Sequence, residues 1–150
     1  MVHFGRVGLN LSLAAVLLCL SATAGLADGR LLGAEQAWRL SQEGKVSVID
    51  VRSAAEWRRT GIPRGARAVT IYDPRGETGF VDAMTRALGG DRTRPIAVIC
   101  ARGNRSTRAR EMLERAGFTN VYDVVDGMLG RGAAKGWIDS GLPVERCRTC

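Results

Sequence analysis

Cys100 is the residue of this chain best placed to act as a nucleophile, because it lies between a strand signal and a helix signal. The apolar run Pro95–Ile99 predicts a buried strand that ends just before it. Ser106 can cap a helix, and residues 108–116 have the spacing of an amphipathic helix. We therefore expect the loop that begins at Cys100 to lead from a strand end into a helix start.

This loop has the composition of an anion-binding site. Loop amides and the positive end of a helix dipole stabilise a negative charge. Arg102 and Arg105 add two positive charges, and Gly103 permits backbone angles that turn the amides inward. Together these features favour a thiolate at Cys100, which is the nucleophilic form of cysteine. They disfavour the alternative of a cysteine that only packs as a small buried hydrophobe.

The first 27 residues have the pattern of a secretory signal peptide. Arg6 gives a basic start, residues 9–20 form an apolar core, and small residues allow cleavage after Ala24 or Ala27. The apolar core is too short to span a bilayer comfortably. We therefore expect export to a bacterial periplasm and no stable membrane association after cleavage.

The remaining chain is predicted to form one domain over residues 28–146, followed by a short tail over residues 147–150. The only histidine, His3, lies in the predicted signal peptide. Cys-His and Ser-His-Asp mechanisms need an imidazole base, so neither is available to the mature chain. Histidine-liganded zinc is excluded for the same reason. A catalytic cysteine would depend on its loop for activation.

The predicted domain alternates helix and strand signals, which indicates an α/β fold with a small parallel sheet flanked by helices on both faces. Helices are expected at residues 35–40, 53–59, 80–88 and 108–116, and strands at residues 46–50, 68–71, 96–99 and 121–125. The glycine-rich stretch 127–136 is predicted to be a loop, and Trp137 should pack on the core. Ligands of such sheets bind beyond the carboxyl ends of the strands, where Asp50, Arg52 and Cys100 fall.

A set of short motifs extends this pattern over Leu32 to Val144. In chain order they are Asp50-Val51-Arg52, Glu56-Trp57, Gly61-Ile62-Pro63, Gly65-Ala66, the loop from Cys100 to Ser106, Gly117-Phe118, Val121-Tyr122, Asp126-Gly127-Met128 and Trp137 to Pro143. Their order and spacing resemble those of a single-domain rhodanese. Met128 departs from the pattern, since many relatives have a second glycine there.

The resemblance implies a rhodanese-like fold and a sulfurtransferase activity without a cofactor or metal. The cysteine that matches Cys100 takes a sulfane sulfur from a small anionic donor such as thiosulfate and becomes a persulfide. The sulfur then passes to cyanide or a thiol. In the family, the residues that match Asp50 and Arg52 mainly hold the loops together. We expect the chain to act as a monomer.

The loop after the cysteine is the expected substrate-binding site. Its residues are Ala101, Arg102, Gly103, Asn104, Arg105 and Ser106. The two arginines could hold the sulfonate oxygens of a donor through charge-assisted hydrogen bonds. We expect Arg102 to face the donor, whereas the sequence leaves the orientation of Arg105 open.

Two other functions fit the same architecture. Cysteine phosphatases also place a thiolate in an anion-binding loop, but they have five residues between the cysteine and the phosphate-binding arginine. Here Arg105 follows Cys100 after four residues, and Ile99 stands where those phosphatases have histidine. The smaller loop suits a sulfur atom better than a phosphoryl group. The second alternative is a module that binds sulfur or responds to redox state without catalysis.

Cys147 and Cys150 form a Cys-x-x-Cys pair at the C-terminal end of the sequence. Two cysteines cannot complete a zinc site, which needs four ligands. One interpretation is a disulfide or a mobile tail, because export favours oxidation and chain ends are often disordered. The other is a sulfur relay, in which the pair takes the sulfur from Cys100 or resolves its persulfide by thiol exchange.

The net charge of +7 at pH 7 is carried mostly by arginine. Basic residues are scattered among acidic neighbours and do not form a stripe, so we expect no nucleic-acid partner. The excess positive charge can still raise the local concentration of small anions near the site.

Overall fold

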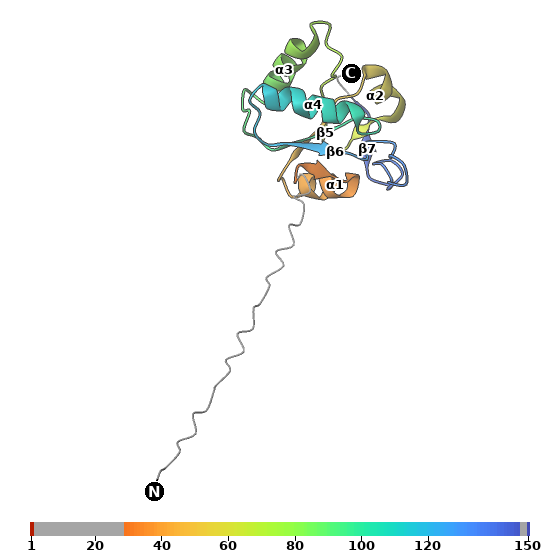
Figure 1. Cartoon of the computed structure of the whole chain (residues 1–150). Coiled ribbons are helices and arrows are strands. Elements are labelled where there is room, and N and C mark those ends of the chain that lie inside the picture. Colours follow the sequence, from red (N-terminus) through yellow and green to blue (C-terminus); the bar gives the residue numbers. More distant parts are fainter. Residues whose placement is uncertain (2–28, 148–149) are drawn as a thin grey trace.

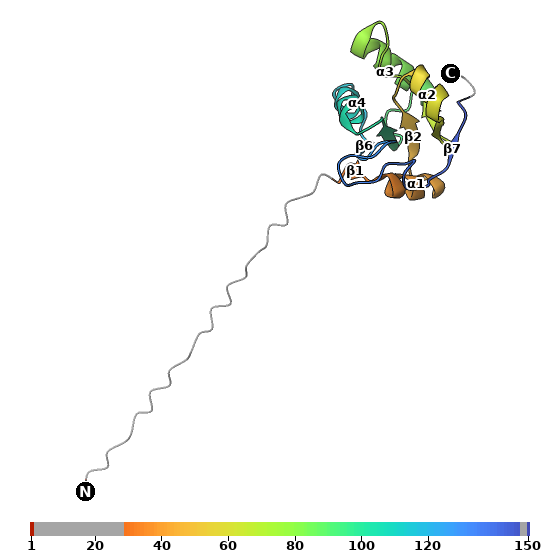
Figure 2. The same ribbon diagram turned by 90° about the vertical axis from the view of Figure 1, so that its right-hand side faces the viewer.

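The central sheet of the computed structural model contains five parallel strands, in the order β1-β6-β5-β2-β4 (Figure 1). The strands are β1 (Leu31–Leu32), β2 (Ser47–Asp50), β4 (Arg67–Ala68), β5 (Ile96–Ile99) and β6 (Val121–Val124). A separate antiparallel pair is formed by β3 (Ile62–Pro63) and β7 (Val144–Glu145). In the turned view, β7 and the end of the chain lie to the right of β2, with α4 (Asn104–Arg115) to its left (Figure 2).

The structure describes Met1, residues 29–147 and Cys150. The predicted signal peptide over residues 1–27 lies outside these described residues, apart from Met1. Within the part of the chain that the structure describes, no helix is long and apolar enough to cross a membrane.

Helices cover both faces of the sheet, as the sequence predicts. They are α1 (Ala34–Gln42), α2 (Ala54–Thr60), α3 (Gly76–Ala87) and α4. Figure 1 shows α1 below the sheet and α3 and α4 above it. The prediction of a small parallel sheet with helices on both faces is confirmed, and all four expected helices are present.

Side chains of the central strands alternate between two apolar clusters because successive residues of a strand point to opposite faces. Along β5, Ile96 and Val98 pack with α3 and α4, whereas Ala97 and Ile99 pack with α1. The next side chain in this alternation, Cys100, belongs to the α3 and α4 cluster. Trp137 is fully buried on the α1 side, as predicted.

Helix α4 begins at Asn104, four residues before the expected start at Arg108, and Ser106 is not its N-cap. Gly103, with φ of +89°, occupies the N-cap position. The hydroxyls of Ser106 and Thr107 both donate to the carbonyl of Gly103, at 2.8 and 3.0 Å, so neither accepts a helix amide as a cap does. The expectation that Ser106 caps the helix was therefore wrong.

Two other boundaries differ from the prediction. The strand expected over residues 68–71 is the two-residue β4. The amides of Val69 and Ile71 still donate to the carbonyls of Asp50, at the end of β2, and of Val51. Helix α3 starts at Gly76 and not at Phe80, because the side chain of Asp73 accepts the amide of Arg75 and turns the chain directly into the helix.

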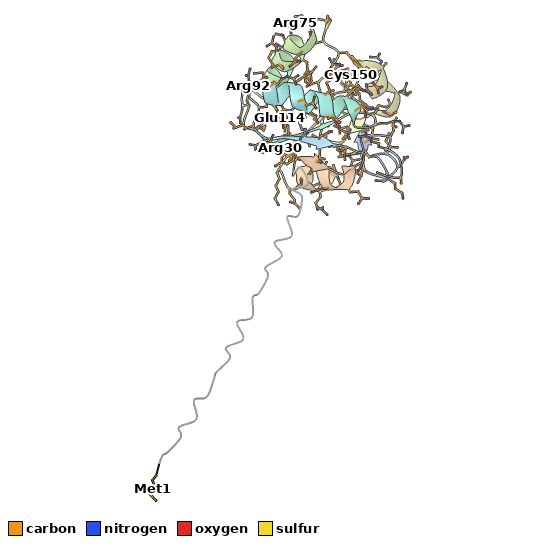
Figure 3. The ribbon with its side chains drawn as sticks, viewed as in Figure 1. Met1, Arg30, Arg75, Arg92, Glu114 and Cys150 are labelled. Carbon is orange, nitrogen blue, oxygen red and sulfur yellow. A yellow bond between two sulfur atoms is a disulfide. The ribbon has the colours of Figure 1, made fainter. Side chains whose placement is uncertain are left out.

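The three strands β1, β3 and β7 were not predicted, because two residues are too few to show periodicity. Strand β1 is fixed at the sheet edge by its pairing with β6. Arg30, just before β1, forms an ion pair of 2.6 Å with Glu114 of α4 (Figure 3). The edge strand and the helix beside the Cys100 loop are thereby tied together.

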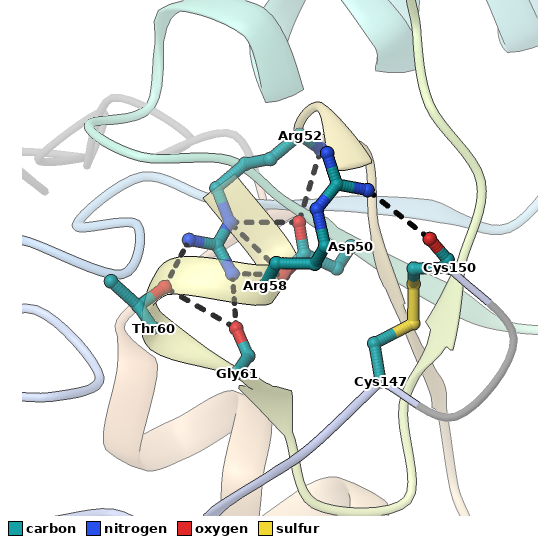
Figure 4. Close-up of a disulfide and its surroundings, with 7 residues drawn as sticks. All are labelled: Asp50, Arg52, Arg58, Thr60, Gly61, Cys147 and Cys150. Atoms are coloured by element: carbon teal, nitrogen blue, oxygen red, sulfur yellow. Dashed lines mark hydrogen bonds and ion pairs between the residues drawn. A yellow bond between two sulfur atoms is a disulfide. The ribbon is translucent and has the colours of Figure 1, made fainter. Parts of the chain in front are cut away.

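A buried ion pair anchors α2 to β2. Asp50 and Arg52 are both almost fully buried, and their closest contact is 2.6 Å. The same guanidinium donates to the Thr60 hydroxyl at 2.8 Å and to the Gly61 carbonyl at 2.7 Å (Figure 4). Both carboxylate oxygens accept from Arg52, so the buried charges are compensated. The two side chains therefore hold the end of β2 to the end of α2.

Arg52→Ala should lower the free energy of unfolding by about 3–5 kcal/mol, because it leaves the carboxylate of Asp50 buried without its partner. Urea unfolding measures this change. The double variant Asp50→Leu/Arg52→Met removes both charges, so its free energy of unfolding should fall less than that of Arg52→Ala. Arg75→Ala, which breaks an exposed pair with Asp82, should change stability by less than about 1 kcal/mol. Equal losses in the single and double variants would contradict the account.

Candidate active site

Cys100 follows the last residue of β5 at the carboxyl edge of the sheet. It is a free cysteine and is only 1% exposed. The fold therefore places the predicted nucleophile at the edge where open α/β sheets bind ligands. Because Cys100 is buried, only small reactants can reach its sulfur atom.

Neighbouring backbone holds the carbonyl groups of the Cys100 loop. The carbonyl of Cys100 accepts from the amide of Met128 at 2.8 Å, and that of Ala101 accepts from Leu129 at 2.9 Å. The carbonyl of Gly103 accepts from the amide of Thr107 at 2.9 Å, in addition to the two hydroxyls described above. The loop carbonyls therefore point toward fixed donors.

The opposite side of the loop presents amide groups. In a trans peptide the C=O of one residue and the N–H of the next point in opposite directions, and no cis peptide is present in the described chain. None of the N–H groups from Ala101 to Ser106 donates to an acceptor in residues 29–147 or Cys150. A run of free donors at the start of a helix is an arrangement that can stabilise an anion.

Glycine is required where the loop from Gly127 to Gly136 meets the Cys100 loop. A Cβ on Gly127 would lie 2.5 Å from the carbonyl oxygen of Ala101 and 2.7 Å from the amide nitrogen of Arg102. Its φ of +62° is also unfavourable for other residues. Gly127 thus permits the close approach that lets Met128 and Leu129 hold the loop carbonyls.

Arg105 is paired with Glu56 of α2. Its two terminal nitrogens donate to the two carboxylate oxygens, each at 2.7 Å. The guanidinium also lies 5.8 Å from the ring centre of the exposed Tyr72. The orientation that the sequence left open is therefore toward Glu56, so Arg105 links the loop to α2.

The position of Glu56 follows from its place at the start of α2. Ser53 and Glu56 form a capping box, in which the carboxylate accepts from the Ser53 amide at 3.0 Å. Hydrogen bonds from Arg105, followed by those from Ser53, lower the pKa of Glu56 to about 2 despite partial burial, which acts in the opposite direction. Glu56 is consequently a carboxylate at neutral pH.

Arg102 is exposed, and it donates to the carbonyl of Gly130 at 3.1 Å. Asn104 is exposed and Ala101 is half-buried, whereas Ser106 is fully buried and bound to Gly103. The structure therefore brings the backbone of the expected loop together but turns the Ser106 side chain into the fold.

Sequence reasoning missed the part played by Glu56 and by the backbone of residues 128–129. The Ser-x-x-Glu spacing of a capping box could have indicated a fixed carboxylate at the start of α2. No side-chain pattern identifies amides that act through the backbone, because any residue except proline has one.

Cys147 and Cys150 form a disulfide, with Cα atoms 5.6 Å apart. Arg58 of α2 donates to the carbonyl of Cys150 at 3.2 Å (Figure 4). The structure thus corresponds to the disulfide interpretation of the tail. A cavity of about 380 Å³ adjoins it, lined by Trp57, Arg58, Gly61, Arg146 and Cys147. Within the described residues, no group of three His, Cys, Asp or Glu side chains could hold a metal ion.

Comparison with known proteins agrees with this geometry. The rhodanese-like domain matches residues 33–131, more than half of the 150-residue chain. The chain therefore belongs to the rhodanese-like domain family.

Named relatives include one sulfurtransferase. The thiosulfate sulfurtransferase GlpE of Pseudomonas savastanoi pv. phaseolicola is 31% identical over 93 residues, covering 62% of this chain and 77% of that protein. The uncharacterized protein RP600 of Rickettsia prowazekii is 29% identical over 98 residues, covering 64% of this chain and 80% of that protein.

Solved structures have the same fold. Rv0390 from M. tuberculosis has a TM-score of 0.63 and 31% identity, covering 78% of this chain and 97% of that one. RPA3614 from Rhodopseudomonas palustris, described as a protein of unknown function and possible tyrosine phosphatase, has a TM-score of 0.56 and 26% identity, covering 77% and 84%. The fold is thus shared by proteins to which different activities are ascribed.

The pair of Glu56 and Arg105 should make stability depend on pH between about 4.5 and 2. The pKa of Glu56 is lower in the folded state, at about 2, than its ordinary value of 4.5. Its stabilisation is therefore complete above pH 4.5 and is lost as the pH falls toward 2.

Thermal unfolding of the parent and Glu56→Gln at several pH values tests this dependence. The parent should be more stable by about 1–2 kcal/mol near neutral pH, after allowance for solvent screening, and the difference should vanish near pH 2. Glu77→Gln, in an exposed pair with Arg115, is the control. A difference that stays constant with pH would refute the role of the Glu56 charge.

Proposed function

We propose that this protein is a sulfurtransferase that carries a sulfane sulfur as a persulfide on Cys100. The observation that carries the proposal is the run of free amide donors from Ala101 to Ser106 beside a free cysteine. Such donors stabilise an anionic sulfur without a partner base. Relationship to a thiosulfate sulfurtransferase supports the same chemistry.

The first half-reaction loads the cysteine. The Cys100 thiolate attacks the outer sulfur of thiosulfate or of a related small anionic donor. A Cys100–sulfur bond forms, the sulfur–sulfur bond of thiosulfate breaks, and sulfite leaves with the electron pair. The negative charge moves to the terminal sulfur of the persulfide, which the loop amides can stabilise.

The second half-reaction unloads it. Cyanide or a thiolate attacks the terminal sulfur, the bond to the Sγ atom of Cys100 breaks, and the cysteine regains its electron pair as a thiolate. Cyanide leaves as thiocyanate, and a thiol acceptor leaves as its own persulfide. Neither half-reaction needs a metal or a cofactor.

A phosphatase activity fits the site less well. Four residues separate Cys100 from Arg105, so the loop is shorter than the one expected for phosphate esters. Arg105 is also held by two hydrogen bonds to Glu56, which occupy the guanidinium edge that a phosphoryl group would use. The 1% exposure of Cys100 favours a small donor over a bulky ester.

The setting of this reaction is part of the proposal. The signal-like pattern of residues 1–27 supports export to a bacterial periplasm. We propose that the mature chain acts there as a monomer on small sulfur compounds, without a nucleic-acid partner or a stable attachment to the membrane.

Intact-protein mass spectrometry after incubation with thiosulfate tests the proposal. The mature chain should gain one sulfur atom, and cyanide should remove it with release of thiocyanate. Cys100→Ser should gain nothing. Hydrolysis of a phosphate ester without any gain of sulfur would replace the proposal by a phosphatase. Absence of both reactions would leave a non-catalytic binding module.

We further propose that the reduced Cys147 and Cys150 pair accepts sulfur from Cys100. The Cys147 thiolate would attack the terminal sulfur of the persulfide and release the Cys100 thiolate. The Cys150 thiolate would then attack the Sγ atom of Cys147 and close the disulfide, and the terminal sulfur would leave with the electron pair, take a proton from water and become hydrosulfide. The sulfane sulfur is reduced to hydrosulfide while the dithiol is oxidised. This relay would end in the same disulfide that a purely structural role would give.

A single-turnover experiment separates this relay from a structural disulfide. Protein reduced beforehand and freed of reductant should release one equivalent of hydrosulfide after thiosulfate is added, and should form the disulfide between Cys147 and Cys150. The double variant Cys147→Ser/Cys150→Ser should stop at the Cys100 persulfide. Equal hydrosulfide release by parent and double variant would refute the relay.

A further inference from the structure

Arg131 lies in a tight hairpin beside the Cys100 loop. Its amide donates to the carbonyl of Ala134 at 3.1 Å, and the amide of Ala134 donates back at 3.0 Å. Gly132, with φ of +60°, allows the chain to reverse between them. The backbone of Arg131 is therefore fixed, although the residue is exposed.

The guanidinium of Arg131 reaches the start of α4. A Cβ built on Gly103 would lie 3.6 Å from its Nη1 atom. Gly103 is the N-cap of α4, a helix of 12 residues, and belongs to the run of free amides. The side chain thus comes from a separate loop to the end of the helix that carries partial positive charge.

The charge of Arg131 is not neutralised by the protein. In the part of the chain that the structure describes, Arg131 belongs to no ion pair. Arg105 differs because Glu56 balances its charge.

Arg102 is the second cation beside the Cys100 loop. Its bonded acceptor is the neutral carbonyl of Gly130, so its charge is retained. Gly130 directly precedes Arg131, and the hydrogen bond therefore brings Arg102 to the backbone beside it. Two uncompensated guanidinium groups thus lie at the same edge of the Cys100 loop.

We propose that Arg131, together with Arg102, binds the oxyanion end of the sulfur donor and makes the site selective for doubly charged sulfur oxyanions of the thiosulfate type. This inference rests on the proposed sulfurtransferase function. Guanidinium groups match such oxygens through charge-assisted hydrogen bonds. A neutral donor has no comparable group for these two arginines to bind.

Steady-state kinetics with thiosulfate and cyanide test the proposal. Arg131→Ala should lower kcat/KM by about tenfold to a hundredfold, mainly through a higher KM for thiosulfate, as expected for the loss of a hydrogen bond to a charged group. Arg131→Lys should recover part of the loss. Arg94→Ala is the matched control, because it removes the same charge from an exposed position before the opposite end of β5.

A second readout does not depend on sulfur transfer. The alkylation rates of Cys100 by anionic iodoacetate and neutral iodoacetamide are compared in each variant. Arg131→Ala should lower the ratio of the iodoacetate rate to the iodoacetamide rate, whereas Arg94→Ala should leave it at the parent value. A ratio in Arg131→Ala equal to that in Arg94→Ala, or an unchanged KM for thiosulfate, would overturn the assignment.

The two readouts also separate this inference from the proposed function. If the parent transfers no sulfur but the alkylation ratio falls in Arg131→Ala, the anion site stands and the sulfurtransferase function fails. If sulfur is transferred with the same KM in Arg131→Ala and in the parent, the function stands and the role of Arg131 fails.

Discussion

The candidate site depends on the hydrogen bonds that hold the carbonyl groups of Cys100 and Ala101. Met128 and Leu129 donate these bonds from a neighbouring loop. Because each carbonyl is fixed on one side, the amide of the following residue is fixed on the other. The protein thereby directs a run of free amides to one side of the loop by backbone contacts alone, and Gly127 provides the close approach that this requires.

Helix α2 connects this site to the rest of the molecule. Asp50 and Arg52 attach its end to β2, while Glu56 at its start holds Arg105. Arg58, on the same helix, contacts the carbonyl of Cys150. A helix of seven residues is too short to be stable alone, so its position depends on these attachments.

The sequence predicted the central strands and the four helices well, because buried alternation and helical spacing are strong signals. The position of Cys100 at a strand end was predicted correctly, and the sequence motifs indicated the family. The sequence could not reveal β1, β3 or β7, which are too short to show a period. It also assigned Ser106 to the helix cap, because a hydroxyl residue before a helical pattern is typical of an N-cap. In the structure Gly103 occupies the N-cap position, so Ser106 already lies inside the helix.

Site chemistry was harder to predict than the fold. The nucleophile and its loop follow from local sequence, but the partner of Arg105 lies 49 residues earlier in the chain. Arg131 comes from a glycine-rich loop whose path is set by backbone contacts with the Cys100 loop. Such long-range neighbours become visible only after the strands are arranged, since their own sequence context gives no signal.

Stabilisation of an anionic sulfur on Cys100 by the loop amides is the central feature of the proposed mechanism. A crystal structure of the protein after treatment with thiosulfate tests it most directly. The account predicts one additional sulfur bonded to the Sγ atom of Cys100, within hydrogen-bonding distance of amides in the run from Ala101 to Ser106. Crystals that bind thiosulfate without gaining this sulfur, or a persulfide that points away from the loop amides, would contradict it.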